Sequence, residues 1–454
     1  MPANKKRLTE RFVQDGSAMV SAPMDACRAA LFAVCLVSAL SSPARAQSTA
    51  SPAAEAPLTL ADAQTSLETG NREIIAARRA LDVAASGVII AGARPNPTVS
   101  AEWTSTTPSS GLGAVRNKQF DSVLHVDQLV ERGGKRELRI ATADALVQAA
   151  RRDLAEVRRQ QRLALEIAYY DLKLAQEKLR IQNDTALLQQ QSVNATQRRF
   201  EAGDAAESEV VRLRVEALRA ANDARAAEAD LIRARQDVAI LIGQEGKAGA
   251  LAAVDDWPAA LPADAAAEPD PASIEARPDV RAAQARVDSA EQARELARRL
   301  LTRDVTVGAQ VERLFPPDPG IGFGGTGYGV SFSVPLFLRY GFEGEVAQAE
   351  AQLTSAMAAR DRQVLIASAE VRRARNEAVA AAERKRRLTE ELLPRAKRAM
   401  DAAEFAYQRG ATPLLDLLDA RRTARAIELE AATAAADFAK ARSALLASRT
   451  VDRP

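Results

Sequence analysis

A long run without proline or glycine constrains the fold most. Residues 138–199 contain neither residue and are rich in alanine, leucine, arginine and glutamate, which favour helices. At 1.5 Å per residue, one helix over this run would extend about 90 Å. Residues 345–393 repeat the feature, and Pro394 after them predicts a kink rather than an end. The two runs predict long helices that pack side by side like a coiled coil.

Composition excludes several classes of function. The chain has 454 residues and a formal net charge of +2, without the basic excess expected of a protein that binds nucleic acid. His125 is its single histidine, and Cys27 and Cys35 are its two cysteines. These are too few ligands for a zinc site, so we expect neither a resident metal nor a cofactor. No group of residues resembles a catalytic site, which indicates a protein that is not an enzyme.

The first 46 residues have the features of a secretion signal. An apolar run at 29–40 follows basic residues and leads into Ala44-Arg45-Ala46, a small-x-small cleavage pattern. We expect cleavage after Ala46, and Val34 before Cys35 disfavours a lipid anchor. No later run is long and apolar enough for a transmembrane helix, so the exported chain would enter a membrane only as strands.

Two halves of the chain are similar to each other. At one constant spacing, Phe200 aligns with Tyr407 and Gly203 aligns with Gly410. This similarity predicts a tandem repeat, with each copy built from a helix, two short strands, a very long helix, a glycine turn and a last helix.

The repeats are assigned the following boundaries. The first repeat covers residues 47–243, with helices at 59–93, 138–199 and 204–242 and strands at 98–105 and 120–130. An inter-repeat segment covers residues 244–272. The second repeat covers residues 273–454, with helices at 273–301, 345–404 and 414–449 and strands at 304–312 and 328–337.

The short segments narrow the choice of architecture. Residues 98–105, 305–312 and 328–337 alternate apolar with polar or small side chains, and residues 120–130 alternate less regularly. Such strands suit either a soluble sheet or a membrane barrel. Four strands cannot close a barrel, and open sheet edges do not occur in lipid. Three chains would supply twelve strands, so contact with lipid predicts a homotrimer.

Several short motifs resemble those of the TolC-like outer-membrane channel family. They are RPNP at 94–97, ERGGKR at 131–136, VPLF at 334–337, and the turn glycines Gly203 and Gly410. The resemblance covers the whole chain after residue 46. The first two motifs resemble the CzcC-like branch, which serves cobalt-zinc-cadmium resistance pumps.

The resemblance implies a mainly α fold with a small β part. Three chains would form a twelve-stranded barrel in the outer membrane on a long helical barrel in the periplasm, with residues 244–272 in a belt around the helices. Lipid would surround six side chains: Val99, Trp103, Val305, Val307, Val330 and Phe332. The implied partners are an inner-membrane proton-driven (RND-type) pump and a periplasmic adaptor. The chain would be a passive exit duct for heavy-metal cations such as cobalt, zinc or cadmium.

The resemblance also implies a periplasmic gate at Tyr407, Asp416 and Asp419. The two aspartates are spaced i,i+3, so they lie on one helix face. In a trimer they would form acidic rings that attract cations. The alternative is a solvated helix face on which both aspartates pair with Arg421 and Arg422.

The arginine that helps to hold this gate shut in the family is Thr412 here. Arg409 or Arg421 is our hypothesis for its substitute. The helical tips would contact the adaptor or pump through six residues, for which an ordinary charged turn is the alternative: Arg199, Phe200, Gly203, Glu207, Glu209 and Gly410.

Two further patterns resemble binding sites, and the fold admits other functions. Gly322-x-Gly324-x-x-Gly327 matches a dinucleotide-binding string, but it opens a strand instead of a helix, which favours a barrel loop. His125 alone on a strand favours a structural role over metal binding. The same fold could serve drug efflux or type I protein secretion. A periplasmic coiled-coil adaptor or scaffold is the alternative from another class.

Overall fold

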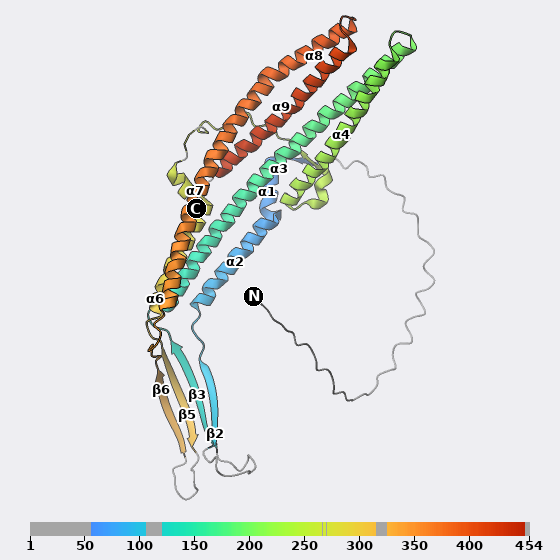
Figure 1. Ribbon diagram of the computed structural model, residues 1–454. Coiled ribbons are helices and arrows are strands. Elements are labelled where there is room, and N and C mark those ends of the chain that lie inside the picture. Colours follow the sequence, from blue (N-terminus) through green and yellow to red (C-terminus); the bar gives the residue numbers. More distant parts are fainter. Residues whose placement is uncertain (1–55, 106–119, 266, 269, 315–324, 450–454) are drawn as a thin grey trace, which may run out of the picture. The chain divides into compact units, whose positions relative to one another are not determined.

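Figure 1 shows a computed structural model of the chain, which is mainly helical with a small β part. All described residues belong to one compact unit. The structure describes residues 56–105, 120–265, 267–268, 270–314 and 325–449. The predicted signal peptide and two glycines of the glycine string, Gly322 and Gly324, lie outside the described residues.

The first helical region is two helices, so the single helix predicted over residues 59–93 is wrong. The structure has α1 at Leu60–Gly70 and α2 at Arg72–Gly92. Asn71 between them has an extended backbone, and its side chain accepts a hydrogen bond from the backbone N–H of Ile74 at 3.1 Å. This side-chain cap starts a new helix, although no proline marks the break.

The first long helix, α3 at Lys135–Glu201, has 67 residues and exceeds the predicted run at both ends. α4 follows at Glu207–Ile242 and begins later than the predicted residue 204. The delay arises because the turn extends to Ala206, whose backbone is extended. A short 3-10 helix at Glu245–Ala250 comes next.

The helices of the second half also contain interruptions, and only the one near Pro394 was anticipated, as a kink. The predicted helix at 273–301 is α5 at Pro271–Glu275 and α6 at Pro278–Arg299. Pro278 disfavours a helical conformation at Arg277, which is extended. The predicted helix at 345–404 is α7, a π-helical segment and α8, and α9 follows. Their bounds are Glu343–Arg386, Arg387–Leu392, Leu393–Gln408 and Leu414–Ser448.

Four strands form an antiparallel sheet in the order β2-β3-β5-β6. β2 and β3 coincide with the residues predicted for the first two strands. The bounds are Thr98–Ser105 for β2, Phe120–Val130 for β3, Val305–Leu314 for β5 and Gly325–Ser333 for β6. The prediction that the last strand covers 328–337 is wrong at both ends. Pro335 has no N–H for a strand ladder, which is consistent with the earlier end.

The sheet register gives one mainly apolar face and one mainly polar face, with exceptions in β3 such as Gln128 on the first and Leu129 on the second. Val126 is paired with both Val99 and Ala309, and Ala309 is paired with Val330. Directly paired residues share a face, and successive residues alternate. One face therefore carries all six residues predicted to meet lipid: Val99, Trp103, Val305, Val307, Val330 and Phe332. The other face carries polar residues that include Glu102, His125, Asp127, Gln310, Glu312 and Ser331.

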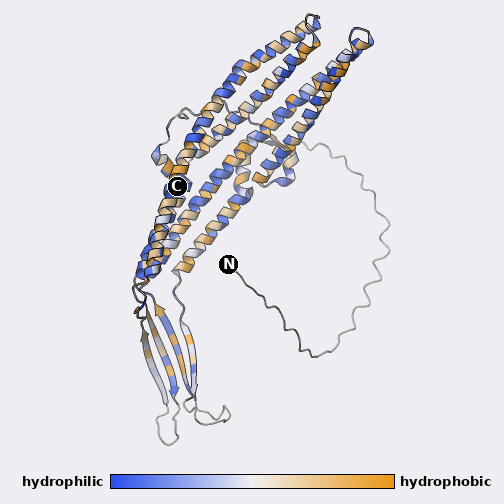
Figure 2. Cartoon of the chain, viewed as in Figure 1, coloured by the Kyte–Doolittle hydropathy of each residue, from blue (hydrophilic) through white to orange (hydrophobic). Residues whose placement is uncertain are grey.

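The long helices pair into two hairpins. α3 packs against α4, α8 packs against α9, and α3 also contacts α9 (Figure 1). Figure 2 shows hydrophobic and hydrophilic residues interspersed along all of these helices. Within the described residues, no helix combines the length and the apolar character that crossing a membrane requires.

The inter-repeat segment is anchored to the middle of α3. β4, at Leu251–Ala253, pairs in parallel with β1, at Ala56–Leu58. The buried Tyr169 hydroxyl donates to the Asp255 carboxylate at 2.9 Å, and burial raises the pKa of this tyrosine to about 12. These contacts hold the start of the described chain and the inter-repeat segment against one helix.

Candidate functional site

The two hairpins end in turns of the same geometry. Gly203 has φ +85° and Gly410 has φ +72°, in the left-handed region that suits glycine. The N–H after each glycine bonds back five residues, from Asp204 to the Arg199 carbonyl at 2.8 Å and from Ala411 to the Ala406 carbonyl at 2.9 Å. Both turns are Schellman motifs, which end a helix and satisfy its last carbonyl groups.

One hydrogen bond joins the tips of the hairpins. The Arg199 guanidinium donates to the Tyr407 hydroxyl at 3.3 Å, and it also donates to the Asp204 carbonyl at 3.4 Å. Arg199 comes from α3 and Tyr407 from α8. The structure thus brings together a predicted tip residue and a predicted gate residue from opposite halves of the chain.

The two arginines that we proposed as substitutes at the gate have other partners. The Arg409 guanidinium lies 4.6 Å from the centre of the Phe405 ring. Arg421 donates to the Ser192 hydroxyl at 2.9 Å and to the Glu404 carboxylate at 3.1 Å. Arg199 occupies the place beside Tyr407 instead. Sequence reasoning missed this because the pair is formed by two helices far apart in the chain.

The two aspartates predicted for the gate are both exposed on α9 but differ in their partners. Asp419 lies 3.5 Å from Arg422, which also binds Glu216 of α4 at 2.6 Å. Asp416 lies in the first turn of α9, where the helix dipole favours a negative charge. It has no ion pair among the described residues. Asp416 therefore retains a free carboxylate at the tip, whereas Asp419 shares the solvated face with Arg422.

Beneath the turns lies a small apolar cluster shared by both hairpins. Val193 and Leu213 come from the first hairpin, Leu414 and Leu417 come from the second, and Tyr407 packs against them. Phe200 remains 39% exposed at the tip, and Glu207 and Glu209 lie in the first turn of α4. The turn residues therefore lie at the end of the hairpins, above a packed apolar cluster.

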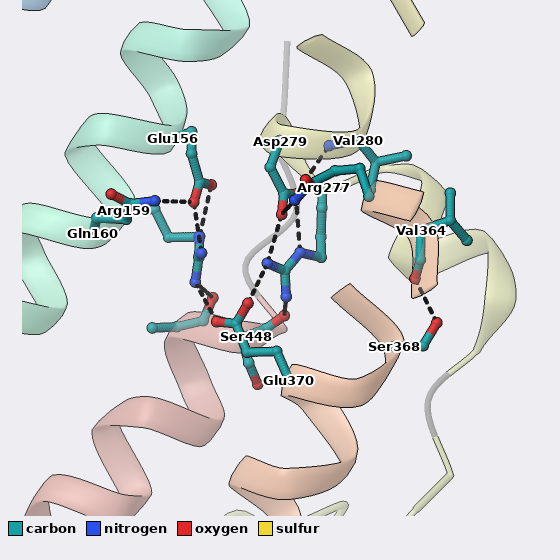
Figure 3. Close-up of polar contacts among 12 residues, drawn as sticks. Glu156, Arg159, Gln160, Arg277, Asp279, Val280, Val364, Ser368, Glu370 and Ser448 are labelled. Carbon is teal, nitrogen blue, oxygen red and sulfur yellow. Dashed lines mark hydrogen bonds and ion pairs between the residues drawn. The ribbon is translucent and has the colours of Figure 1, made fainter. Parts of the chain in front are cut away.

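A buried ionic cluster that the sequence did not indicate lies at the far end of α9 (Figure 3). Arg277 is 1% exposed and forms two hydrogen bonds to Asp279, at 2.8 and 3.1 Å. It also donates to Glu370 at 2.8 Å and to the Ser448 carbonyl at 3.0 Å. Arg159 donates to the other Glu370 oxygen at 3.1 Å. Glu370 of α7 therefore bridges two arginines, and both cap the end of α9, because Arg159 also donates to the Ala447 carbonyl at 3.3 Å.

Burial and pairing act in opposite directions on the charges of this cluster. Burial raises the pKa of Asp279, but the hydrogen bonds and charge of Arg277 outweigh it and hold that pKa below its usual range. Burial likewise lowers the pKa of Arg277, and its two carboxylate partners more than reverse this. Both groups are therefore charged at neutral pH. The cluster joins four segments of the chain, so no local spacing could have revealed it.

Among the described residues, no group of three or more His, Cys, Asp or Glu side chains is placed to hold a metal ion. His125 lies in β3, paired with Ser100 and Gln310.

Comparison with known proteins identifies the family. The model of the outer membrane efflux protein family matches residues 54–244 and 271–448. The chain belongs to this family. It is therefore an outer-membrane efflux channel, and the family predicted from the motifs is confirmed. Members of the family act in tripartite systems with an inner-membrane pump and an adaptor.

Individual relatives are similar over most of their length. The chain is 28% identical to the cobalt-zinc-cadmium resistance protein CzcC of Cupriavidus metallidurans, over 82% of this chain and 84% of that protein. Its fold matches the outer-membrane channel OprN with a TM-score of 0.71 and 23% identity, over 86% of this chain and 89% of OprN. The CusC channel matches with a TM-score of 0.69 and 16% identity, over 87% and 92%.

Proposed function

We propose that three copies of the chain form the exit duct of a metal efflux system, with a heavy-metal cation as cargo. The observation that carries the duct is the sheet, whose register puts apolar side chains on one face and polar side chains on the other. In a closed barrel, the apolar face would contact lipid and the polar face would line a water-filled lumen. The two repeats would each supply one hairpin of strands and one hairpin of helices.

The edges of the sheet support closure by neighbouring copies. β2 and β6 each have one neighbour among the described strands. An unpaired edge exposes backbone groups that lipid cannot satisfy. In the proposed trimer, β6 of one copy pairs with β2 of the next, which closes twelve strands. Val99, Trp103, Val330 and Phe332, which are 67–72% exposed in one chain, would then contact lipid.

The helical tips support a gate at the periplasmic end. The Arg199–Tyr407 hydrogen bond ties the second hairpin to the first, and its loss would free the second hairpin to move outward. Asp416 would form a ring of three carboxylates, and Asp419 a second ring partly neutralised by Arg422. Such rings favour cations over anions. The six tip residues predicted as contacts would face the adaptor or the RND-type pump.

The cargo is proposed from the relative CzcC, whose name assigns it to cobalt, zinc and cadmium resistance. The duct would be passive, and the pump would select the ion. Drug efflux and type I protein secretion remain the alternatives for the same fold. Membership of an outer-membrane efflux family sets aside the alternative of a periplasmic adaptor.

A clean deletion strain should become sensitive to divalent metals and recover on complementation. Growth is measured across cobalt, zinc, cadmium, nickel and a panel of drugs, and the metal that stops growth identifies the cargo. Because export through a duct protects only against its cargo, drug tolerance should be unchanged. Sensitivity to drugs with normal metal tolerance would reject the metal cargo and retain the channel.

Replacing Tyr407 with phenylalanine should increase the open fraction of the gate. The change removes the hydroxyl that accepts from Arg199 and keeps the ring in the apolar cluster. One hydrogen bond contributes about 1 kcal/mol, which is about a fivefold change in an equilibrium constant. Single-channel recordings of trimers in planar bilayers measure the open fraction. The matched control, Arg409→Ala, removes an arginine that contacts Phe405 and should leave it unchanged.

A further inference from the structure

The two long helices differ at one place. α3 is α-helical without a break, whereas its counterpart contains the π-helical segment Arg387–Leu392 between α7 and α8. Pro394 follows as the second residue of α8 and has no N–H for the carbonyl four residues earlier. The regular i→i−4 ladder is therefore interrupted over this turn. Single π-helical turns within α-helices frequently occur at functional sites.

We propose that residues 387–392 are the hinge about which α8 swings when the periplasmic gate opens. This inference rests on the proposed gate at Tyr407, and it names the part of the chain that moves. On one side of the hinge, α7 stays fixed. On the other side, α8 carries Tyr407 away from α3.

Buried contacts fix the chain on the α7 side of the hinge. Glu370 of α7 binds the buried Arg277 at 2.8 Å (Figure 3). Two residues before the π-helical segment, the Lys385 ammonium donates to the Pro258 carbonyl at 2.7 Å and lies 4.5 Å from the centre of the Phe438 ring. Phe438 is 2% exposed. Moving α7 would expose these charges and this ring without partners, so α7 resists motion.

The contacts between the two hairpins on the tip side are more exposed. Arg422 binds Glu216 at 2.6 Å, with the arginine side chain 51% and the glutamate side chain 13% exposed. Arg425 binds Asp223 at 2.6 Å, with the arginine 24% and the aspartate 51% exposed. One member of each pair is half-exposed, so water can replace its partner when the pair breaks. The second hairpin is thus held to the first by contacts that can open, together with the small apolar cluster around Leu417.

Small side chains on α9 face the hinge. Leu388 of the π-helical segment packs against Ala431 and Ala434. α9 has no break there, so it would bend gently while these small residues slide past Leu388. The helix from Leu392 to Tyr407 is about 22 Å long at 1.5 Å per residue. A bend of about 20° would displace its tip by about 8 Å, which is enough to break the contact with Arg199.

The first test asks whether residues 387–392 contain one residue more than a regular α-helix would need to span the same length. A π-helical turn accommodates more residues than an α-helical turn. Deleting the exposed Glu390, together with Pro394→Ala, should convert the segment into α-helix and keep the flanking helices in place. The matched control deletes Asn183 from the uninterrupted α3. The first variant should retain heat-sensitive trimers on gels and the control should lose them, whereas equal loss would overturn the hinge.

The second test measures which side of the hinge moves. Spin labels are placed at Gln408 on α8 or at Asn376 on α7, both exposed, in trimers with Cys27 and Cys35 replaced by alanine. Pulsed electron double resonance measures the distances between the spin labels on different chains of the trimer. The Tyr407→Phe variant should shift the distances at Gln408 and not at Asn376. Combining it with the Glu390 deletion and Pro394→Ala should abolish that shift.

Two other outcomes separate the hinge from the gate. A shift at Gln408 that persists after the deletion overturns the hinge and leaves the gate at Tyr407 intact. In the second outcome, Tyr407→Phe leaves the label distances unchanged, but the deletion narrows the distance distribution at Gln408 and not at Asn376. The hinge is then supported, and the assignment of the gate to Tyr407 is wrong.

Discussion

Replacing Val330 with arginine should prevent folded trimers from accumulating in the outer membrane. Val330 is 70% exposed in one chain and lies on the apolar face of the sheet, paired with Ala309. Arginine on the lipid face of a barrel costs about 2–4 kcal/mol near the membrane midplane, and each trimer would carry three. The measurement is the fraction of outer-membrane protein that migrates as a heat-sensitive trimer on gels.

Gln310→Arg is the matched control for this prediction. Gln310 follows Ala309 in β5, so its side chain lies on the opposite, polar face. An arginine there would stay in water in the proposed lumen, and trimers should form at a normal level. If both variants lost trimers to the same extent, the assignment of the two faces to lipid and lumen would be wrong.

Replacing Arg277 with methionine should be the most damaging change in the helical part. Methionine removes the charge, leaves Asp279 without its arginine partner and the Ser448 carbonyl at the end of α9 without this donor, and leaves Glu370 with Arg159 alone. Removing one partner of a buried ion pair typically costs about 3–5 kcal/mol, because a charge remains buried and uncompensated. Thermal unfolding followed by circular dichroism should show a lower midpoint in detergent.

Arg286→Met provides the comparison. Arg286 binds Asp153 at 2.6 Å in a pair whose side chains are 51% and 45% exposed. Such a pair contributes at most about 1 kcal/mol, so the midpoint should change little. Similar midpoints for the two variants would show that the buried cluster does not anchor α9.

The sequence was most informative where one local pattern decides the structure. The run at 138–199 is helical because it contains no helix-breaking residue, and Gly203 and Gly410 lie at turns because their φ angles suit glycine. Period-two alternation marked β2 at its observed residues. Motifs such as RPNP and ERGGKR were specific enough to indicate the family, which the family match confirms.

The sequence was least informative where contacts distant in the chain decide the structure. The break at Asn71 depends on a side-chain cap, and the earlier strand end at Ser333 on the pairing of β6 with β5. Pro394 signalled an irregularity in the second long helix, but the π-helical form of residues 387–392 was not expected.

For this protein, the sequence by itself determined the long helices, the glycine turns and the family, because each depends on nearby residues or on a recurring motif. Only the tertiary structure decided that Arg199 accompanies Tyr407 and that Arg277 and Glu370 form a buried cluster. Those pairs join residues from different helices. How the helices pack decides which side chains pair. The spacing of residues along the chain does not show which side chains of different helices lie close together.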